Sequence, residues 1–128
     1  MKLLLDTHVL LWWLADDPRL GPIARSAIAD PGSEVLVSVV SLWEIVVKIR
    51  IGKLTAEIGR IEQAIVRDGF ERLGITSAHL ATLAGLEAHH RDPFDHLLIA
   101  QAVTEDAIFV SDDQRSPLYS VQVIRCGS

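Results

Sequence analysis

The chain is poor in three features that would each point to a particular class of protein. Its single cysteine, Cys126, excludes an internal disulfide bond and a zinc site built on cysteines. The longest apolar run near the start, residues 9–15, is far too short to cross a membrane. Asp6 and His8 interrupt the apolar start, so it does not match a secretory leader. We therefore expect a cytoplasmic protein with no membrane partner.

Positive charge is scarce as well. The chain has 12 Lys and Arg against 17 Asp and Glu, which gives a formal net charge of −5. Proteins that bind nucleic acid over a broad passive surface are usually basic, so the balance argues against such a surface. It fits better with a cluster of carboxylates that cations neutralise. The mean hydropathy of +0.29 is high for a small protein and suggests that a partner or a second copy covers apolar surface.

The 128 residues suit one domain, and no repeat or linker rich in Pro, Gly or Ser divides them. We expect a single domain over residues 1–128. Apolar, β-branched segments predict strands at Lys2–Leu5, Val35–Val40, Arg72–Ile75, Ala107–Ser111 and Val121–Arg125. Helices are predicted at Thr7–Ala15, Pro22–Ala29, Ser41–Ile51, Glu57–Arg67, Ser77–Glu87 and Pro93–Thr104. This alternation predicts an α/β fold with a mostly parallel sheet covered on both faces.

Acidic residues are predicted at the carboxyl ends of the strands, where open α/β sheets carry their function. Asp6 directly follows the first strand, and the pair Asp112-Asp113 follows Ser111 at the fourth. Glu44 is expected in the first turn of the helix after the second strand, and Asp95 in the first turn of its own helix. All of them are predicted to face one edge of the sheet.

Each acid also has a structural explanation when it is taken alone. The segment Ser41–Glu44 matches the capping box S-x-x-E, and Asp92 before Pro93 is a good helix N-cap. Asp95 then lies near the third helical position, where the helix dipole favours negative charge. Asp6 suits the cap of the helix at Thr7, and Asp112-Asp113 suits a solvated turn.

A convergence of the acids at one edge is harder to explain by capping, because a cap needs one acid per helix and no contact between acids. Packed carboxylates raise one another's pKa unless a cation lies among them. Oxygen ligands of this kind suit Mg²⁺ or Mn²⁺. Such a site can polarise a phosphate and activate a water molecule for attack on it.

Four segments of this sequence together resemble a PIN-domain ribonuclease of the VapC type, the toxin half of a toxin–antitoxin pair. They are LLLDTHVLLWWL (3–14), SVVSLWEIVVKIRIGKL (38–54), HHRDPFDHLLIAQA (89–102) and IFVSDDQ (108–114). They cover nearly the whole chain in the right order. The patterns D-T-H-x-L-L-W, S-x-W-E-I and D-P-F-D-x-L-L-I-A-Q-A are specific in combination, whereas any one alone is weak.

The resemblance implies a three-layer α/β/α sandwich with a five-stranded sheet and a divalent-metal site built from acids. Matched motif by motif, the acids are Asp6, Glu44, Asp95 and Asp113, which we expect to bind Mg²⁺ (or Mn²⁺) and to catalyse hydrolysis of RNA phosphodiester bonds. Asp112 is the alternative to Asp113 as the fourth acid. Further candidates for the site are Asp92, Asp112, Ser111 and Thr7.

The same resemblance implies two partners, an RNA substrate and a cognate antitoxin protein that inhibits the enzyme. The high mean hydropathy separately favours a second copy of the chain in a homodimer. Asp92 is then the helix cap, while Asp95 holds metal at the same helix start.

Two other protein classes also place acidic residues at such an edge. A phosphatase of the haloacid-dehalogenase type needs a second Asp two positions after the first, and His8 occupies that position. A receiver-like signalling or metal-binding module with an acidic pocket would leave Glu44 and the D-P-F-D segment unexplained. The receiver-like module is the alternative that we retain.

Overall fold

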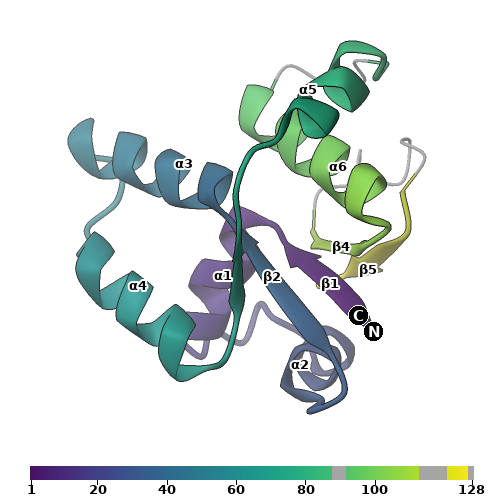
Figure 1. Cartoon of the computed structure of the whole chain (residues 1–128). Coiled ribbons are helices and arrows are strands. Elements are labelled where there is room, and N and C mark those ends of the chain that lie inside the picture. The colour runs from purple at the N-terminus through teal and green to yellow at the C-terminus, as the bar shows by residue number, and fades with distance from the viewer. Residues whose placement is uncertain (88–91, 113–120, 127–128) are drawn as a thin grey trace.

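The computed structural model, which describes residues 1–87, 92–112 and 121–126, contains a parallel five-stranded sheet between two layers of helices (Figure 1). The strands are β1 (Lys2–Leu5), β2 (Glu34–Ser38), β3 (Glu71–Leu73), β4 (Ile108–Ser111) and β5 (Val123–Arg125). The helices are α1 (Thr7–Leu14), α2 (Pro22–Ala29), α3 (Val39–Arg50), α4 (Ile58–Arg67), α5 (Ser77–Ala84) and α6 (Pro93–Glu105). The strand order is β3-β2-β1-β4-β5, and every pairing is parallel. The predicted α/β fold is confirmed.

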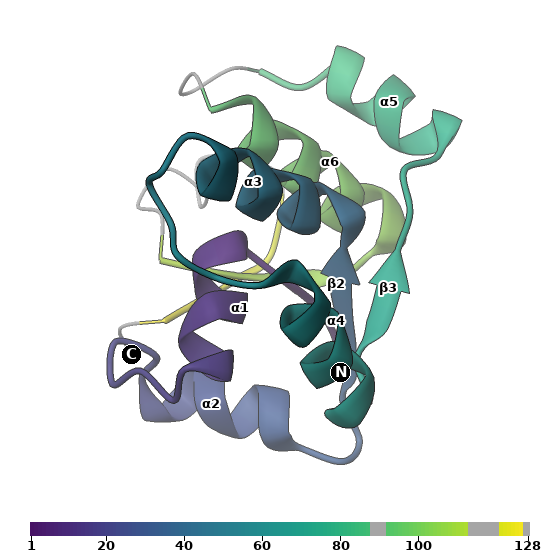
Figure 2. The ribbon, with the colours of Figure 1, turned by 90° about the vertical axis from the view of Figure 1, so that its left-hand side faces the viewer.

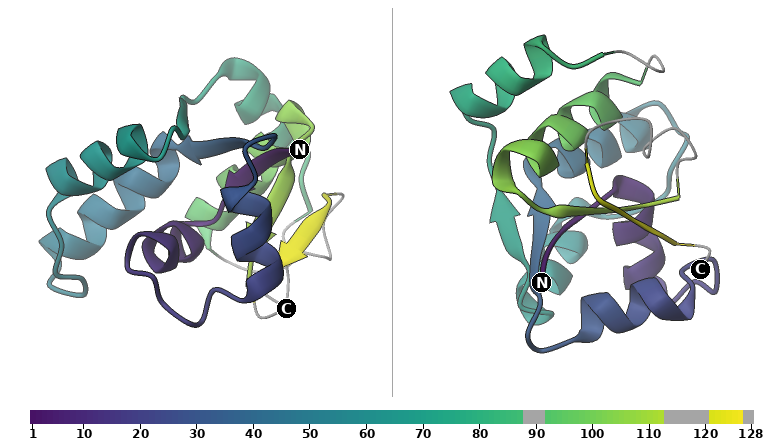
Figure 3. Two further views of the ribbon diagram at one scale, coloured as in Figure 1. Left: turned by 90° about the horizontal axis from the view of Figure 1, so that it is seen from below. Right: turned by 90° about the vertical axis from the view of Figure 1, so that its right-hand side faces the viewer.

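The central strand β1 is buried on both faces, which explains its uninterrupted apolar sequence. Leu3 and Leu5 pack against α1, α2, α3 and α4, whereas Leu4 packs against α6 on the opposite face. This alternation follows from the two-residue repeat of a strand. Figures 2 and 3 show the two helical layers from the side and from below, with α5 lying on the outside of α6.

The boundary between β2 and α3 differs from the prediction, and the difference moves Glu44. The strand ends at Ser38, and the helix begins at Val39, because the Ser38 hydroxyl accepts a hydrogen bond from the Val40 amide at 3.0 Å. Ser38 is therefore the N-cap, so the predicted capping box from Ser41 to Glu44 is wrong. Glu44 lies in the second turn of α3 and not in the first. The β-branched pair Val39-Val40 favours a strand, but the capping serine outweighs that preference.

The end of α3 is set by a glycine in the left-handed region. The helix ends at Arg50, one residue before the predicted end, with Ile51 as the C-cap and Gly52 after it at φ of +77°. The Lys53 amide donates to the Lys48 carbonyl at 2.9 Å and the Gly52 amide donates to the Ile49 carbonyl at 3.1 Å. This pair of bonds is a Schellman motif, which favours glycine at that position. The other element ends lie within three residues of the predicted ones.

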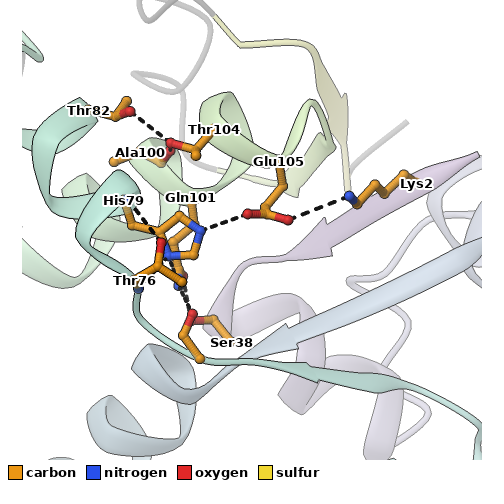
Figure 4. Close-up of polar contacts among 10 residues, drawn as sticks. Lys2, Ser38, Thr76, His79, Thr82, Ala100, Gln101, Thr104 and Glu105 are labelled. Carbon is orange, nitrogen blue, oxygen red and sulfur yellow. Dashed lines mark hydrogen bonds and ion pairs between the residues drawn. The ribbon is translucent and has the colours of Figure 1, made fainter.

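A buried polar network fastens α5 to α6 and to the sheet (Figure 4). His79 is fully buried at the third position of α5, where its Nδ1 accepts a hydrogen bond from the Thr76 amide at 3.0 Å. Its Nε2 lies 2.9 Å from Oε2 of Glu105. Since Nδ1 accepts, the ring proton is on Nε2 and is donated to the carboxylate. The hydrogen bond from His79 is the main reason that the pKa of Glu105 is lowered.

The network continues along α6 to the carboxyl end of β2. Gln101 donates through Nε2 to the carbonyl of Gly74 at 3.2 Å, and its Oε1 accepts from the hydroxyl of Ser38. At the other end, Glu105 pairs with Lys2 of β1 at 3.6 Å. Within residues 1–87, 92–112 and 121–126, no buried side-chain nitrogen or oxygen lacks a hydrogen-bond partner. The same ranges contain no helix that is both long enough and apolar enough to span a membrane.

Candidate active site

Asp6 lies at the carboxyl end of β1 and is held on both of its carboxylate oxygens. Oδ1 accepts a hydrogen bond from the amide of Thr7 at 2.7 Å, so Asp6 caps α1 as expected. Oδ2 accepts one from the hydroxyl of Ser111, the last residue of the neighbouring strand β4, at 2.8 Å. Burial raises the pKa of Asp6, and the negative charge of Glu44 raises it further. The two hydrogen bonds and His8 act in the opposite direction.

Glu44 is connected to Asp6 through Thr7, which contacts both carboxylates. The Thr7 hydroxyl lies 2.7 Å from Oε1 of Glu44 and 3.0 Å from the hydroxyl of Ser41. A carboxylate only accepts, so the Thr7 proton goes to Glu44 and the Ser41 hydroxyl donates to Thr7. Oε2 of Glu44 accepts from the Lys48 ammonium at 2.7 Å, one turn further along α3. This buried carboxylate therefore has both a neutral donor and a cation as partners.

The N-terminus of α6 brings two further aspartates to the same place. Asp92 caps the helix by accepting hydrogen bonds from the amides of Phe94 and Asp95, at 3.0 and 3.3 Å. Asp95 occupies the third helical position and is buried. The predicted division between a capping aspartate and a first-turn aspartate at this helix start is thus confirmed in position.

Most of these acids line one open cleft of about 380 Å³. Its lining contains Asp6, Asp92, Asp95 and Asp112, together with His8, Trp12 and Arg19. Glu44 is not part of the lining but lies next to it through Thr7. Asp113, predicted as the fourth acid, lies outside the described residues.

The donor chemistry suits a hard divalent cation, since every candidate ligand is a carboxylate oxygen. A cation beside Asp6 would also offset the burial that raises its pKa. Among the described residues, no three His, Cys, Asp or Glu side chains are grouped closely enough to hold one ion. Glu44 is paired with Lys48, and Asp113 lies outside the described ranges. The joint ligand set of Asp6, Glu44, Asp95 and Asp113 stays a prediction.

Several residues of this site were not singled out from the sequence. Lys48 pairs with Glu44, and its spacing of four residues from Glu44 is the usual signal for an ion pair on one helix face. Ser41, the predicted start of a capping box, instead contacts Thr7 of α1. Trp12 and Arg19 meet in the cleft by a contact that no local spacing reveals.

Cys126 is bonded to β4 next to the site, where its amide donates to the Ser111 carbonyl at 3.4 Å. We expect its thiol to be chemically inert. Its thiol is buried, and burial, followed by the charges of Asp112 and Asp6, raises its pKa to about 12. At pH 8 the reactive thiolate is then only about one part in ten thousand. We expect a thiol reagent such as Ellman's reagent to label the native protein at least tenfold more slowly than the denatured chain. Equal rates in the two states would contradict the burial.

Comparisons with known proteins agree with the fold. The family model of the PIN domain matches residues 3–122. Ribonuclease VapC22 of Mycobacterium tuberculosis is 31% identical over 121 residues, which cover 88% of this chain and 87% of that protein. A structure of VapBC2 from Rickettsia felis, bound to a DNA fragment from its promoter, has a TM-score of 0.74 at 13% identity and 98% coverage of both chains. VapBC-1 from nontypeable Haemophilus influenzae has a TM-score of 0.68 at 14% identity, with both chains fully covered.

Proposed function

Because this chain belongs to the PIN domain family, we propose that it is a metal-dependent endoribonuclease and the toxin of a type II toxin–antitoxin pair. The observation that carries the proposal is the cleft lined by Asp6, Asp95 and Asp112, with Glu44 joined to its edge through Thr7. The ribonuclease activity is inferred from the 31% identity with ribonuclease VapC22. The toxin assignment comes from the same relative and from the VapBC complexes that share the fold.

We assign the metal, Mg²⁺ or Mn²⁺, to Asp6, Glu44 and Asp95, with Asp113 or Asp112 as the fourth acid. When bound, the ion supplies Lewis acidity that polarises a phosphate and makes water a better nucleophile. The protein orients the proposed ligands: the backbone amide of Thr7 and the hydroxyl of Ser111 fix the two carboxylate oxygens of Asp6. Thr7 and Lys48 do the same for Glu44. The fourth acid is proposed to orient the attacking water.

The remaining assignments follow from the family and from the named complexes. We propose a single domain over residues 1–128 that acts in the cytoplasm on RNA and is inhibited by a cognate antitoxin protein. A homodimer is proposed on the basis of the mean hydropathy of +0.29.

The direct test is cleavage of total RNA by the purified protein, free of any partner, with Mg²⁺ or Mn²⁺. We expect discrete fragments with metal and a rate at least tenfold lower with EDTA, restored by added metal, because the ion stabilises charge that develops on the phosphate. Cleavage that persists unchanged in EDTA would contradict the metal mechanism. Incubation with acetyl phosphate separates the alternative, since a receiver-like module acquires a labile acyl phosphate and a nuclease does not.

A further inference from the structure

One wall of the acidic cleft carries two aromatic rings, tilted relative to each other, and a cation in place of carboxylates. His8 and Trp12 are one turn apart on α1, with ring centroids separated by 6.1 Å and ring planes inclined by 35°. Cζ of Arg19, in the loop that follows α1, lies 5.0 Å from the centroid of the Trp12 ring. All three residues line the same cleft as the aspartates. The proposed chemistry assigns no task to this wall.

The guanidinium of Arg19 is fixed at one edge and open at the other. Its Nε lies 3.1 Å from Oδ1 of Asp17, and its Nη2 donates to Oδ2 at 2.7 Å. Nη1 has no hydrogen-bond partner within the described part of the chain, and the side chain is 68% exposed. The ion pair lowers the pKa of Asp17 to about 2, so the pair stays charged at any working pH. Arg19 thus presents an oriented donor edge to solvent.

The loop that carries Arg19 is anchored on both sides of that residue. Asp17 also accepts a hydrogen bond from the Arg19 amide, at 2.9 Å, which fixes the turn. The next residue, Leu20, is buried in the core, and the Gly21 amide donates to the Cys126 carbonyl at 2.6 Å. The position of Arg19 relative to the cleft is therefore set before any ligand arrives, which lowers the entropic cost of binding.

Charge decides what this wall would attract. A phosphodiester strand that enters the cleft meets several carboxylates, and among the described lining residues Arg19 is the only Lys or Arg. A guanidinium binds phosphate oxygens through its planar fork and stacks on aromatic faces. RNA-binding proteins use aromatic rings and arginine planes for unpaired nucleotides. We propose that Trp12 and Arg19 form a subsite for single-stranded RNA, in which Arg19 holds a phosphate adjacent to the one that is cut. This inference rests on the proposed ribonuclease function.

The test is the salt dependence of RNA binding, which reports phosphate contacts directly. The probe is a fluorescein-labelled pool of short random single-stranded RNA, with Mg²⁺, and binding is followed by anisotropy in an Asp6→Asn background that does not cut it. We expect Arg19→Gln to weaken binding about fivefold to tenfold and to reduce the slope of log K against log salt by about 0.7, the loss of one phosphate contact. Arg19→Lys should keep most of the slope, because it keeps the charge.

Arg67→Gln is the matched control. Arg67 is 69% exposed and pairs with Asp68, much as Arg19 pairs with Asp17, but it lies at the end of α4 and does not line the cleft. Its substitution should leave the slope unchanged. In the otherwise unchanged enzyme, Arg19→Gln should raise KM about fivefold and leave kcat within about twofold, since only binding outside the reacting bond is lost.

Two results would overturn the subsite and are distinguishable from each other. If Arg19→Gln and Arg67→Gln give the same slope while the unchanged enzyme still cuts RNA in a metal-dependent way, only the subsite is wrong. If the parent protein does not bind single-stranded RNA and the unchanged enzyme does not cut it, the proposed function fails together with the subsite.

Discussion

Replacing Asp6 by asparagine should abolish cleavage while leaving the fold intact. Asn keeps the shape of the side chain and is as good an N-cap as Asp, so the hydrogen bond from the Thr7 amide survives. The negative charge proposed to hold the metal is lost. We expect the rate of metal-dependent RNA cleavage to fall by about 10²–10³-fold, the usual cost of removing one group that stabilises transition-state charge. Single-turnover cleavage assays at saturating metal measure this effect.

The same substitution should raise thermal stability, and the sign follows from the pKa of Asp6. Burial raises that pKa in the folded protein, so the folded state holds the proton more tightly than the unfolded chain does. Stability from this group is present below the unfolded pKa and is lost as pH rises through the folded pKa. Asn does not ionise, so the variant escapes the destabilisation caused by a buried charged carboxylate. Without metal we expect its Tm at pH 7.5 to be about 2–5 °C higher than that of the unchanged protein. The difference should shrink as the pH falls towards the acidic pKa of an unfolded Asp.

Asp30→Asn is the control for Asp6→Asn. Asp30 is exposed at the end of α2 and accepts a hydrogen bond from the Gly32 amide at 2.9 Å, which an Asn can also accept. It undergoes the same charge change as Asp6 without lining the cleft. Cleavage and Tm should both match those of the unchanged protein. Retention of full activity by Asp6→Asn would remove Asp6 from the mechanism, and a fall in Tm at pH 7.5 would contradict the direction of its pKa shift.

The sequence was sufficient to predict the features that depend on local patterns. The apolar run Lys2–Leu5 identified the central strand, and Asp92 before Pro93 identified both the cap of α6 and the position of Asp95. The edge at which the acids lie followed from the order of strands and helices alone, because parallel strands end on the same side of a sheet.

The sequence was not sufficient where two elements meet. Ser38 and Ser41 are both plausible caps, and only the packing of α3 decides between them. The hydrogen bond of Thr7 to Glu44 spans 37 positions of the chain, and the pairing of His79 with Glu105 spans 26. Contacts at such separations depend on the register between layers, which residue spacing within one element does not encode.

Replacing His79 by alanine should cause a large loss of stability, because several interactions end on this one buried ring. The Thr76 amide loses its acceptor, Glu105 loses a donor, and a cavity opens between α5 and α6. We expect the free energy of unfolding to fall by about 3–4 kcal/mol, from the cavity and the unpaired polar groups together. This corresponds to a decrease in Tm of about 10–15 °C for a chain of this size. Denaturant unfolding gives the free energy of unfolding and a thermal melt gives Tm, both followed by circular dichroism.

Two milder variants separate the contributions of the ring. In His79→Gln the amide oxygen can accept from the Thr76 amide, as Gln does in an ordinary capping box, so only the contact with Glu105 is lost. We expect the free energy of unfolding to fall by about half as much in His79→Gln as in His79→Ala. Glu105→Gln keeps an acceptor for Nε2 of His79 and loses the negative charge on that bond and the partly exposed pairing with Lys2, so it should cost about 1 kcal/mol. A His79→Ala variant as stable as Glu105→Gln would show that α5 is held mainly by its apolar contacts with α6. The predicted ranking, with alanine costliest and Glu105→Gln least costly, instead makes the histidine the principal link between α5 and the rest of the fold.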